Sequence, residues 1–313
     1  MQDAKSGKRT EKRFLFGEMA CYNETYKRTG IPPEQKENTM KKLNIAIIGY
    51  GRSGCDIHGA FLRSKDNDIC NVVAVVEYDP ARAEAARKDF GCDTYSDYRE
   101  LFHRTDIDFV TNASYSNEHF PVALDLLNHG FNVLCEKPLC KSPEQVQQLM
   151  DAAKAHNCEL TIFHQYRYND YYLEMKKLLD KKVLGDVKLV RARQNFFARR
   201  YDWQTLLYRE GGAMRNNAAH TIEQIMDLAG SDELPEIHSR MEIWNSVGDA
   251  EDYMFATMKY SNGTVYEVEV NPSDAYADGC LFDIYGTLGT MKVYSSKIQY
   301  KYFDPCLLYT SPS

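Results

Sequence analysis

Residues 43–54 read Leu-Asn-Ile-Ala-Ile-Ile-Gly-Tyr-Gly-Arg-Ser-Gly, and this stretch decides the fold. An apolar run leads into three glycines, which predicts a buried strand, a tight turn and the start of a helix. Gly49 would permit the turn, Gly51 would let the backbone approach a pyrophosphate, and Gly54 would let the helix pack closely on the strand. The pattern predicts a dinucleotide-binding unit, with a glycine turn that binds no ligand as the alternative.

Similar apolar runs recur along the next hundred residues, most of them separated by segments with helical spacing. Uninterrupted apolar runs, in place of alternation, are typical of parallel strands that are covered on both faces. We therefore expect an α/β domain over residues 40–164, a Rossmann fold with a doubly wound parallel sheet that binds NAD. The further strands are expected at 72–76, 107–110, 131–135 and 160–163, and the helices at 81–90, 118–128 and 143–156.

The pattern changes after residue 164. Helices are expected at 170–179 and 219–228, and strands at 187–195, 238–244, 253–260, 264–270, 281–285 and 290–294. Several strands alternate, and Asn262-Gly263 lies between two of them as a hairpin turn signal. We expect an α+β domain over residues 165–305, with an open, mostly antiparallel sheet and helices on one face, which serves substrate binding and oligomerisation.

Both ends of the chain differ from this body. Residues 1–39 are charged and have no lasting apolar period, so we expect a disordered or non-native extension before Met40. A genuine flexible arm is the alternative. Residues 306–313, Cys-Leu-Leu-Tyr-Thr-Ser-Pro-Ser, resemble the translation of a sequencing adapter. We expect that the native second domain is truncated near Pro305.

Composition excludes several classes. The chain has 313 residues, of which 43% are hydrophobic and 27% charged, as in globular proteins. No stretch reaches the roughly 18 apolar residues of a membrane span, so we expect no membrane association and a cytoplasmic location. A net charge of -7 argues against a nucleic-acid partner. Nine cysteines without a CxxC pair predict buried free thiols and no metal site.

One short basic cluster stands out. It consists of Arg191, Arg193, Arg199 and Arg200. It is either a solvated strand face followed by a loop, or a site for an anionic group on the substrate.

The cofactor's ribose has a candidate partner in Glu77. This acid ends the apolar run after the glycines, where a carboxylate accepts the ribose hydroxyls and repels a 2'-phosphate. NAD is therefore expected over NADP, although Arg52 and Arg82 leave NADP as an alternative. The cofactor contacts expected around the glycine turn are Gly49, Tyr50, Gly51, Arg52, Ser53, Gly54, Glu77 and Arg82.

Glu136-Lys137-Pro138 follows a buried strand, at the sheet edge where ligands bind in such folds. A lysine there could hydrogen-bond a reacting hydroxyl and stabilise a developing alkoxide through its charge. Pro138 restricts the turn, with either a trans or a cis peptide bond. The alternative is a Glu-Lys turn on the surface.

A third segment runs from Gly211 to His220 and leads into an apolar helix. Asn216 and His220 are four residues apart, so both project from one face if the helix already runs through this stretch. His220 could then exchange a proton while Asn216 orients its ring. A capping or core histidine is the alternative.

Together these three segments resemble the glucose-fructose oxidoreductase, inositol dehydrogenase and rhizopine-catabolism (Gfo/Idh/MocA) family over about residues 40–305. The resemblance implies a Rossmann domain with an open-sheet domain, NAD or NADP as cofactor, and a sugar or cyclitol substrate. It implies Lys137 and His220 as the catalytic pair. The chain departs from the family by having Asn216 in place of aspartate, and Ser114-Tyr115-Ser116 where the family has Thr-Pro-Asn ahead of the histidine that is His119 here.

The resemblance also implies further site residues and partners. Ser114, His119, Glu136 and Lys137 are expected at the cofactor, and Gln165, Arg167, Asn216 and His220 at the substrate. His119 is expected near the nicotinamide, with a structural role as its alternative. The expected partners are a small-molecule sugar or cyclitol and further copies of the chain, joined through the C-terminal sheet.

Two other functions stay open. The same scaffold could be an NAD-dependent glycosidase that uses transient oxidation, which shows no net formation of NADH. It could also be a non-catalytic, cofactor-sensing binding protein, which Asn216 in place of aspartate favours and the retained Lys137 and His220 oppose.

Overall fold

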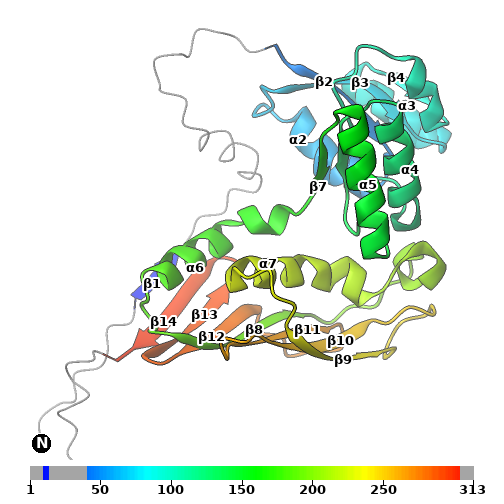
Figure 1. The fold of residues 1–313 in the computed structure, drawn as a ribbon. Coiled ribbons are helices and arrows are strands. Elements are labelled where there is room, and N and C mark those ends of the chain that lie inside the picture. Colours follow the sequence, from blue (N-terminus) through cyan, green and yellow to red (C-terminus); the bar gives the residue numbers. More distant parts are fainter. Residues whose placement is uncertain (1–9, 14–40, 304–313) are drawn as a thin grey trace, which may run out of the picture. The chain divides into compact units, whose positions relative to one another are not determined.

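The computed structural model describes residues 10–13 and 41–303 of the chain (Figure 1). It consists of two compact units that divide between His164 and Gln165. We call residues 41–164 the N-terminal unit, and residues 165–303 with 10–13 the C-terminal unit. Each is described by itself.

The N-terminal unit is built on a parallel six-stranded sheet with the order β4-β3-β2-β5-β6-β7. The chain starts in the middle of this sheet, moves to one edge and then returns to build the other half, so β2 and β5 flank the point where the strand order reverses. Such a sheet binds ligands beyond the carboxyl ends of its strands at that point. The strands are β2 (Leu43–Ile48), β3 (Cys70–Val76), β4 (Asp93–Tyr95), β5 (Phe109–Asn112), β6 (Val133–Cys135) and β7 (Leu160–Ile162).

Both faces of this sheet are buried, as the apolar runs predict. Ala46 and Ile48 of β2 pack into one apolar cluster, whereas Ile45 and Ile47 pack into another. The covering helices are η2 (Arg52–Gly59), α2 (Ala60–Arg63), α3 (Pro80–Phe90), η3 (Tyr98–His103), α4 (Ser116–Asn128) and α5 (Pro143–His156). The helix after the glycine turn is a π-helix over its first eight residues and continues as the α-helix α2.

The C-terminal unit is an eight-stranded sheet with the order β1-β14-β13-β12-β8-β11-β10-β9. Only β8 and β11 pair in parallel, and every other neighbouring pair is antiparallel. The strands are β1 (Thr10–Arg13), β8 (Val187–Asn195), β9 (Glu236–Glu242), β10 (Tyr253–Lys259), β11 (Val265–Asn271), β12 (Cys280–Gly286), β13 (Gly289–Tyr294) and β14 (Lys297–Tyr302).

Helices lie along one face of this sheet (Figure 1). Tyr172 and Met175 of α6 and Ile225 of α7 pack with Val190 and Ala192 of β8 in one apolar cluster. The helices are η4 (Gln165–Tyr168), α6 (Asp170–Asp180), η5 (Trp203–Thr205), η6 (Leu207–Arg209), η7 (Met214–Ala218) and α7 (Ala219–Ala229). The expected α+β unit with a mostly antiparallel sheet is confirmed.

Two further predictions concern residues of this sheet. The Asn262-Gly263 hairpin is confirmed, because β10 and β11 pair across it and Gly263 has a φ of +82°. Within the expected disordered or non-native extension over residues 1–39, Thr10–Arg13 pair with β14, and the extension itself stays a prediction. A sheet edge offers unpaired N–H and C=O groups to any extended segment, whatever its hydrophobicity. Residues 1–9, 14–39 and 306–313 lie outside the described residues.

Candidate functional site

The glycine turn of the N-terminal unit leaves room for a ligand at one position and none at the other two. A β-carbon on Gly49, whose φ is +84°, would lie 2.5 Å from the carbonyl oxygen of Ala113. A β-carbon on Gly54 would collide with the carbonyl oxygen of Gly49. At Gly51 the nearest atom would be Nη1 of Arg82, at an ordinary 3.6 Å. The turn therefore fits a dinucleotide, because Gly51 opens the backbone at a helix start, where N–H groups bind phosphate.

Glu77, the predicted ribose acceptor, is buried and accepts a hydrogen bond from the backbone of this turn. Its Oε2 accepts a hydrogen bond from the backbone N–H of Tyr50 at 2.8 Å, and its Oε1 accepts one from Asp79 at 3.0 Å. Each carboxylate oxygen has a further lone pair, so a ribose hydroxyl can still donate to it. Tyr50 is itself held by its hydroxyl, which donates to Asp89 at 2.6 Å.

Arg52, Ser53 and Arg82 lie around the turn, and both arginines are exposed. Beside them, a pair of tyrosine hydroxyls that sequence reasoning missed links β3 to the loop after β5. The hydroxyls of Tyr78 and Tyr115 are 2.9 Å apart, and this hydrogen bond raises the pKa of Tyr78 to about 12. An exposed Tyr78 and a half-buried Tyr115 in separate loops carry no sequence signal of this kind.

Lys137 lies in the turn after β6 and precedes a cis peptide bond to Pro138. Its neighbour Glu136 is buried and pairs with His58 of η2, with 3.1 Å between Oε1 and Nε2. Burial acts to raise the pKa of Glu136, but the hydrogen bond from His58 and the charges of His58, Lys137 and His119 lower it overall. The sequence predicted Glu136 at the site but not its partner, because His58 is 78 residues away.

His119 joins this turn to the loop after β5. Its Nδ1 is 2.7 Å from the carbonyl oxygen of Pro138, and its Nε2 is 3.1 Å from that of Ser114. Asn112 organises the loop, because its amide donates to the carbonyl oxygen of His119 and its Oδ1 accepts from the Ser114 hydroxyl at 2.7 Å. The structure thus brings Ser114, His119 and the Lys137-Pro138 turn together within the N-terminal unit.

In the C-terminal unit, His220 is buried in the first turn of α7. Its ring stacks on Tyr166, with 4.1 Å between the ring centroids and 12° between the planes. Tyr166 is anchored in turn, because the Gln224 amide donates to its carbonyl oxygen at 2.8 Å. The helix expected from residue 219 is confirmed, whereas the condition that it already runs as an α-helix through Asn216 is not met. Residues Met214–Ala218 form the π-helix η7, and α7 begins at Ala219. Such π turns are frequent at functional sites.

Asn216 belongs to a chain of side-chain amides. Its Oδ1 accepts from Gln204 at 2.7 Å, and its Nδ2 donates to Oδ1 of Asn217 at 3.2 Å. Asn217 donates to Gln194 at 3.4 Å, and Gln194 donates to the hydroxyl of Thr221 at 2.6 Å. Every member donates to the next, which orients all of the amides. An aspartate at 216 could accept from Gln204 but could not donate to Asn217.

A pocket opens beside this amide chain, within the C-terminal unit. Its polar lining includes the amide residues Gln204, Asn216 and Asn217 and the charged residues Arg200, Glu251 and Asp252, and its apolar lining includes Phe196 and Pro272. Amides and charged side chains together offer both donors and acceptors, which suits the hydroxyl groups of a ligand.

Gln165 and Arg167, predicted at the substrate, lie together in η4. The Arg167 guanidinium forms an ion pair with Glu223 of α7. Burial raises the pKa of Glu223, and the charge of Arg167 opposes that shift. Arg167 thus links η4 to α7, the helix that carries His220.

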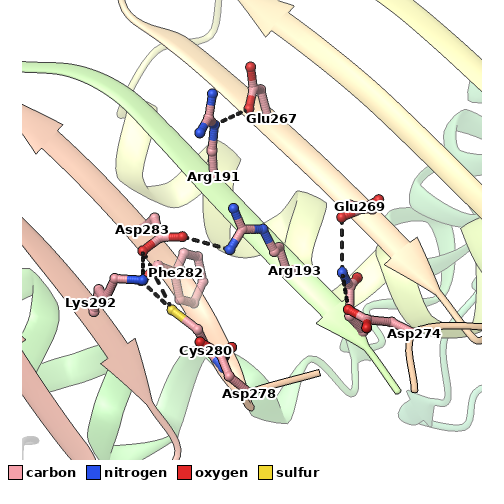
Figure 2. A network of polar contacts seen from close by, with 11 residues as sticks. Arg191, Arg193, Glu267, Glu269, Asp274, Asp278, Cys280, Phe282, Asp283 and Lys292 are labelled. Atoms are coloured by element: carbon pink, nitrogen blue, oxygen red, sulfur yellow. Dashed lines mark hydrogen bonds and ion pairs between the residues drawn. The ribbon is translucent and has the colours of Figure 1, made fainter. Parts of the chain in front are cut away.

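The basic cluster is engaged within the protein (Figure 2). Arg191 pairs with Glu267 and Arg193 with Asp283, each at 2.6 Å. Lys292 also reaches Asp283, at 3.2 Å. These side chains alternate with the buried residues of their strands, so they lie on the sheet face opposite α6 and α7. Arg200 pairs with Asp202. A strand face with local charge pairing accounts for Arg191 and Arg193, whereas Arg200 also lines the pocket described above.

None of the described helices is long and apolar enough to span a membrane. Among the residues that the structure covers, no group of three or more acidic, histidine or cysteine side chains could hold a metal ion.

Known proteins resemble this chain in both units. The family model described as "Oxidoreductase family, NAD-binding Rossmann fold" matches residues 43–164, and that of the GFO/IDH/MocA C-terminal domain matches residues 172–292. An uncharacterized oxidoreductase of Streptococcus pneumoniae is 26% identical over 226 residues, which cover 69% of this chain and 60% of that protein. The chain thus spans less than two thirds of the length of that relative.

A second relative and a solved structure extend the comparison. The scyllo-inositol 2-dehydrogenase (NADP(+)) of Bacillus subtilis is 23% identical over 261 residues, covering 82% of this chain and 70% of that enzyme. The WlbA dehydrogenase of Bordetella pertussis, solved with NADH and UDP-GlcNAcA, matches with a TM-score of 0.75 and 21% identity, covering 85% of this chain and 79% of that one. That likeness shows the fold. With both family models matched in order, the chain belongs to the Gfo/Idh/MocA oxidoreductase family, with an NAD-binding Rossmann domain followed by the family's C-terminal domain.

Proposed function

We propose that this protein transfers hydride between a nicotinamide cofactor and a ring hydroxyl of a sugar or cyclitol. Residues 40–164 bind the cofactor, and residues 165–305 bind the substrate. The observation that carries the proposal is the placement of His220, buried in the first turn of α7 and stacked on Tyr166, four residues after an asparagine that lines an amide-rich pocket.

Different residues of the chain carry out different parts of an alcohol oxidation. His220 accepts the hydroxyl proton, and the stacked Tyr166 ring restricts the orientation of its imidazole. Lys137 stabilises the negative charge that develops on the substrate oxygen. Asn216 orients the substrate and His220 by hydrogen bonding, and the amide chain from Gln204 to Asn217 holds it in one rotamer. When bound, the nicotinamide cofactor supplies the hydride acceptor.

The cofactor is held at the glycine turn of the N-terminal unit. Gly51, Arg52 and Ser53 supply the helix start that faces the pyrophosphate. Glu77 accepts the ribose hydroxyls, which favours NAD over NADP, because a 2'-phosphate would lie against its carboxylate. Ser114 and His119 line the same edge of the sheet, after β5.

The substrate class follows from the pocket and from the relatives. The pocket presents amides together with Arg200, Glu251 and Asp252, and Arg200 is paired with Asp202, so a substrate recognised through hydroxyl groups fits it. A scyllo-inositol dehydrogenase and a dehydrogenase solved with a nucleotide sugar acid are both similar to this chain. scyllo-Inositol and the sugar of UDP-GlcNAcA both carry hydroxyls on a six-membered ring.

The test is a spectrophotometric screen of sugars and cyclitols with NAD and with NADP, using the purified protein. We expect one of them to produce net NADH, read at 340 nm. Product formation without net NADH would favour the glycosidase reaction instead. Cofactor binding without turnover of any compound would favour the cofactor-sensing function and would overturn the proposal.

Two further properties belong to this proposal. We propose that copies of the chain associate through the C-terminal sheet, because its face opposite α6 and α7 is not covered by any helix of the same unit (Figure 1). We also propose a cytoplasmic location, because all seven cysteines within the described residues are free thiols. Light scattering of the purified protein and fractionation of the cells that contain it test the two statements.

A further inference from the structure

His119 has an unusual pair of hydrogen-bond partners. Both of its ring nitrogens lie at hydrogen-bond distance from backbone carbonyl oxygens, Nδ1 from that of Pro138 and Nε2 from that of Ser114. The side chain is only 2% exposed, so water cannot replace either partner.

A carbonyl oxygen accepts a hydrogen bond and never donates one. A neutral imidazole has one N–H and one lone pair, so it satisfies one of these carbonyls and points its lone pair at the other. An imidazolium has two N–H groups and satisfies both. The geometry therefore selects the charged ring, provided that its charge is compensated nearby.

That compensation comes from the carboxylate of Glu136. The positive charges of His58, Lys137 and His119 all act to lower the pKa of Glu136, so the four groups form one local set of charges. His58 approaches Glu136 from η2, and Lys137 follows it in the same turn. The carboxylate of Glu136 attracts a charged His119 ring, which offsets part of the cost of burying that charge.

We propose that His119 is a buried imidazolium, and that its two N–H groups tie the Ser114 carbonyl to the Pro138 carbonyl and so position Lys137. His119 is then a positioning residue, which acts on the reaction through the turn that carries the lysine. The part of this inference that concerns catalysis rests on the proposed function of Lys137. The charge state and the position of the turn do not.

The charge has a consequence for stability. A ring that binds its proton more firmly in the folded than in the unfolded chain stabilises the fold. That contribution is complete below about pH 6.5, where the unfolded ring is also protonated, and is lost as pH rises through the value at which the folded ring deprotonates.

The first experiment counts ring protons by NMR on protein labelled with ¹⁵N in histidine. At pH 7.5 we expect both ring nitrogens of His119 to carry a proton. His119→Gln assigns the signal, because it alone disappears in that variant. A single protonated nitrogen in the His119 ring would overturn the charge.

The second experiment reads the turn itself and needs no substrate. The amides of Tyr115 and Leu139 share their peptide units with the carbonyls of Ser114 and Pro138, so their ¹⁵N shifts report those hydrogen bonds. We expect His119→Gln to move both, and to move the amide of Lys137 as well. The control is His156→Gln, the same change at an exposed position of α5, which should move none of the three. An unmoved Lys137 amide would overturn the positioning role.

The third measurement compares melting temperatures with pH. His119→Gln should lower the melting temperature more at pH 6 than at pH 9, whereas a histidine that merely fills space gives the same loss at both. With a substrate in hand, we expect turnover to fall about 10- to 100-fold, the scale of a misplaced catalytic group, while KM changes little. If no compound is turned over, the proposed function fails, but the proton count and the amide shifts still decide the inference.

Discussion

The side chains of His58 and Glu136 form a buried hydrogen bond inside the N-terminal unit, with 3.1 Å between Nε2 and Oε1 and exposures of only 3% and 6%. The pair links the helix after the glycine turn to the turn that carries Lys137. This contact makes η2 and the turn that carries Lys137 depend on one carboxylate.

Replacing Glu136 by alanine leaves His58 buried without this acceptor. We expect a loss of about 3–5 kcal/mol in the free energy of unfolding, the usual cost of breaking a buried pair. Urea denaturation measures it. Because the folded pKa of Glu136 is lowered, the stabilisation is present above about pH 4.5 and disappears as pH falls through the folded value. Glu84→Ala, which breaks an exposed pair with Arg87, is the control and should cost little. Equal losses for the two variants would contradict a buried pair.

The cofactor preference depends on the charge of Glu77. We expect the wild type to bind NAD more tightly than NADP, and Glu77→Gln to narrow that difference by about 1–3 kcal/mol. Glutamine is the better variant because it keeps one of the two acceptors for the Tyr50 and Asp79 N–H groups, whereas alanine would remove both. Titration of both cofactors into wild type, Glu77→Gln and the exposed control Glu84→Gln gives the answer. NADP binding as tight as NAD in the wild type would count against the prediction.

Turnover should depend on both His220 and Lys137. We expect His220→Ala and Lys137→Ala each to lower turnover by about 100-fold or more, the scale for losing a proton acceptor or an electrostatic group. Cofactor affinity should change little for His220→Ala. Initial rates with the substrate from the screen, together with cofactor titration, measure both. If turnover survives His220→Ala, the proton acceptor lies elsewhere, and Tyr166 and His164 are tested next.

Asn216→Asp should move the pH profile of turnover. A carboxylate near His220 favours the protonated imidazole, so the rise of turnover with pH should shift to higher pH. The variant also loses the donor to Asn217, so we expect some loss of maximal rate. Asn262→Asp makes the same chemical change in the β10–β11 hairpin, where Asp-Gly is as favourable as Asn-Gly, and should leave the profile in place. An unshifted profile would show that Asn216 does not act on the histidine.

Asp283 should contribute strongly to the stability of the C-terminal sheet. Its side chain is 3% exposed and accepts from both Arg193 and Lys292 (Figure 2). Asp283→Ala leaves two cations facing each other, so we expect a loss of about 3–5 kcal/mol in unfolding experiments. Glu267→Ala is the matched control. Its carboxylate is more exposed than that of Asp283 and pairs with Arg191 alone, so this variant should cost less. Equal losses in the free energy of unfolding for the two variants would show that Asp283 contributes no more than Glu267.

Local sequence determined much of this fold. The apolar run Leu43–Ile48 is β2, and the segment Pro143–His156 is α5, within the residues that the pattern marked. Strong periodicity and turn residues act over a few neighbours, so they can be read without knowing the fold. Short, half-exposed elements were missed, among them β4 and β14, because their hydrophobic pattern is weak. The pairing of residues 10–13 with β14 depends on an available sheet edge rather than on apolar side chains.

The candidate site divides in the same way. The glycines, Lys137 and His220 could be found from motifs, because each motif keeps its chemistry within a few residues. The partners of these residues could not. His58 meets Glu136 across 78 residues, and the two carbonyls that bind His119 belong to separate loops of the sheet edge. Which buried donor meets which acceptor is decided by long-range packing, which must satisfy every buried polar group at once, and only the tertiary structure contains that solution.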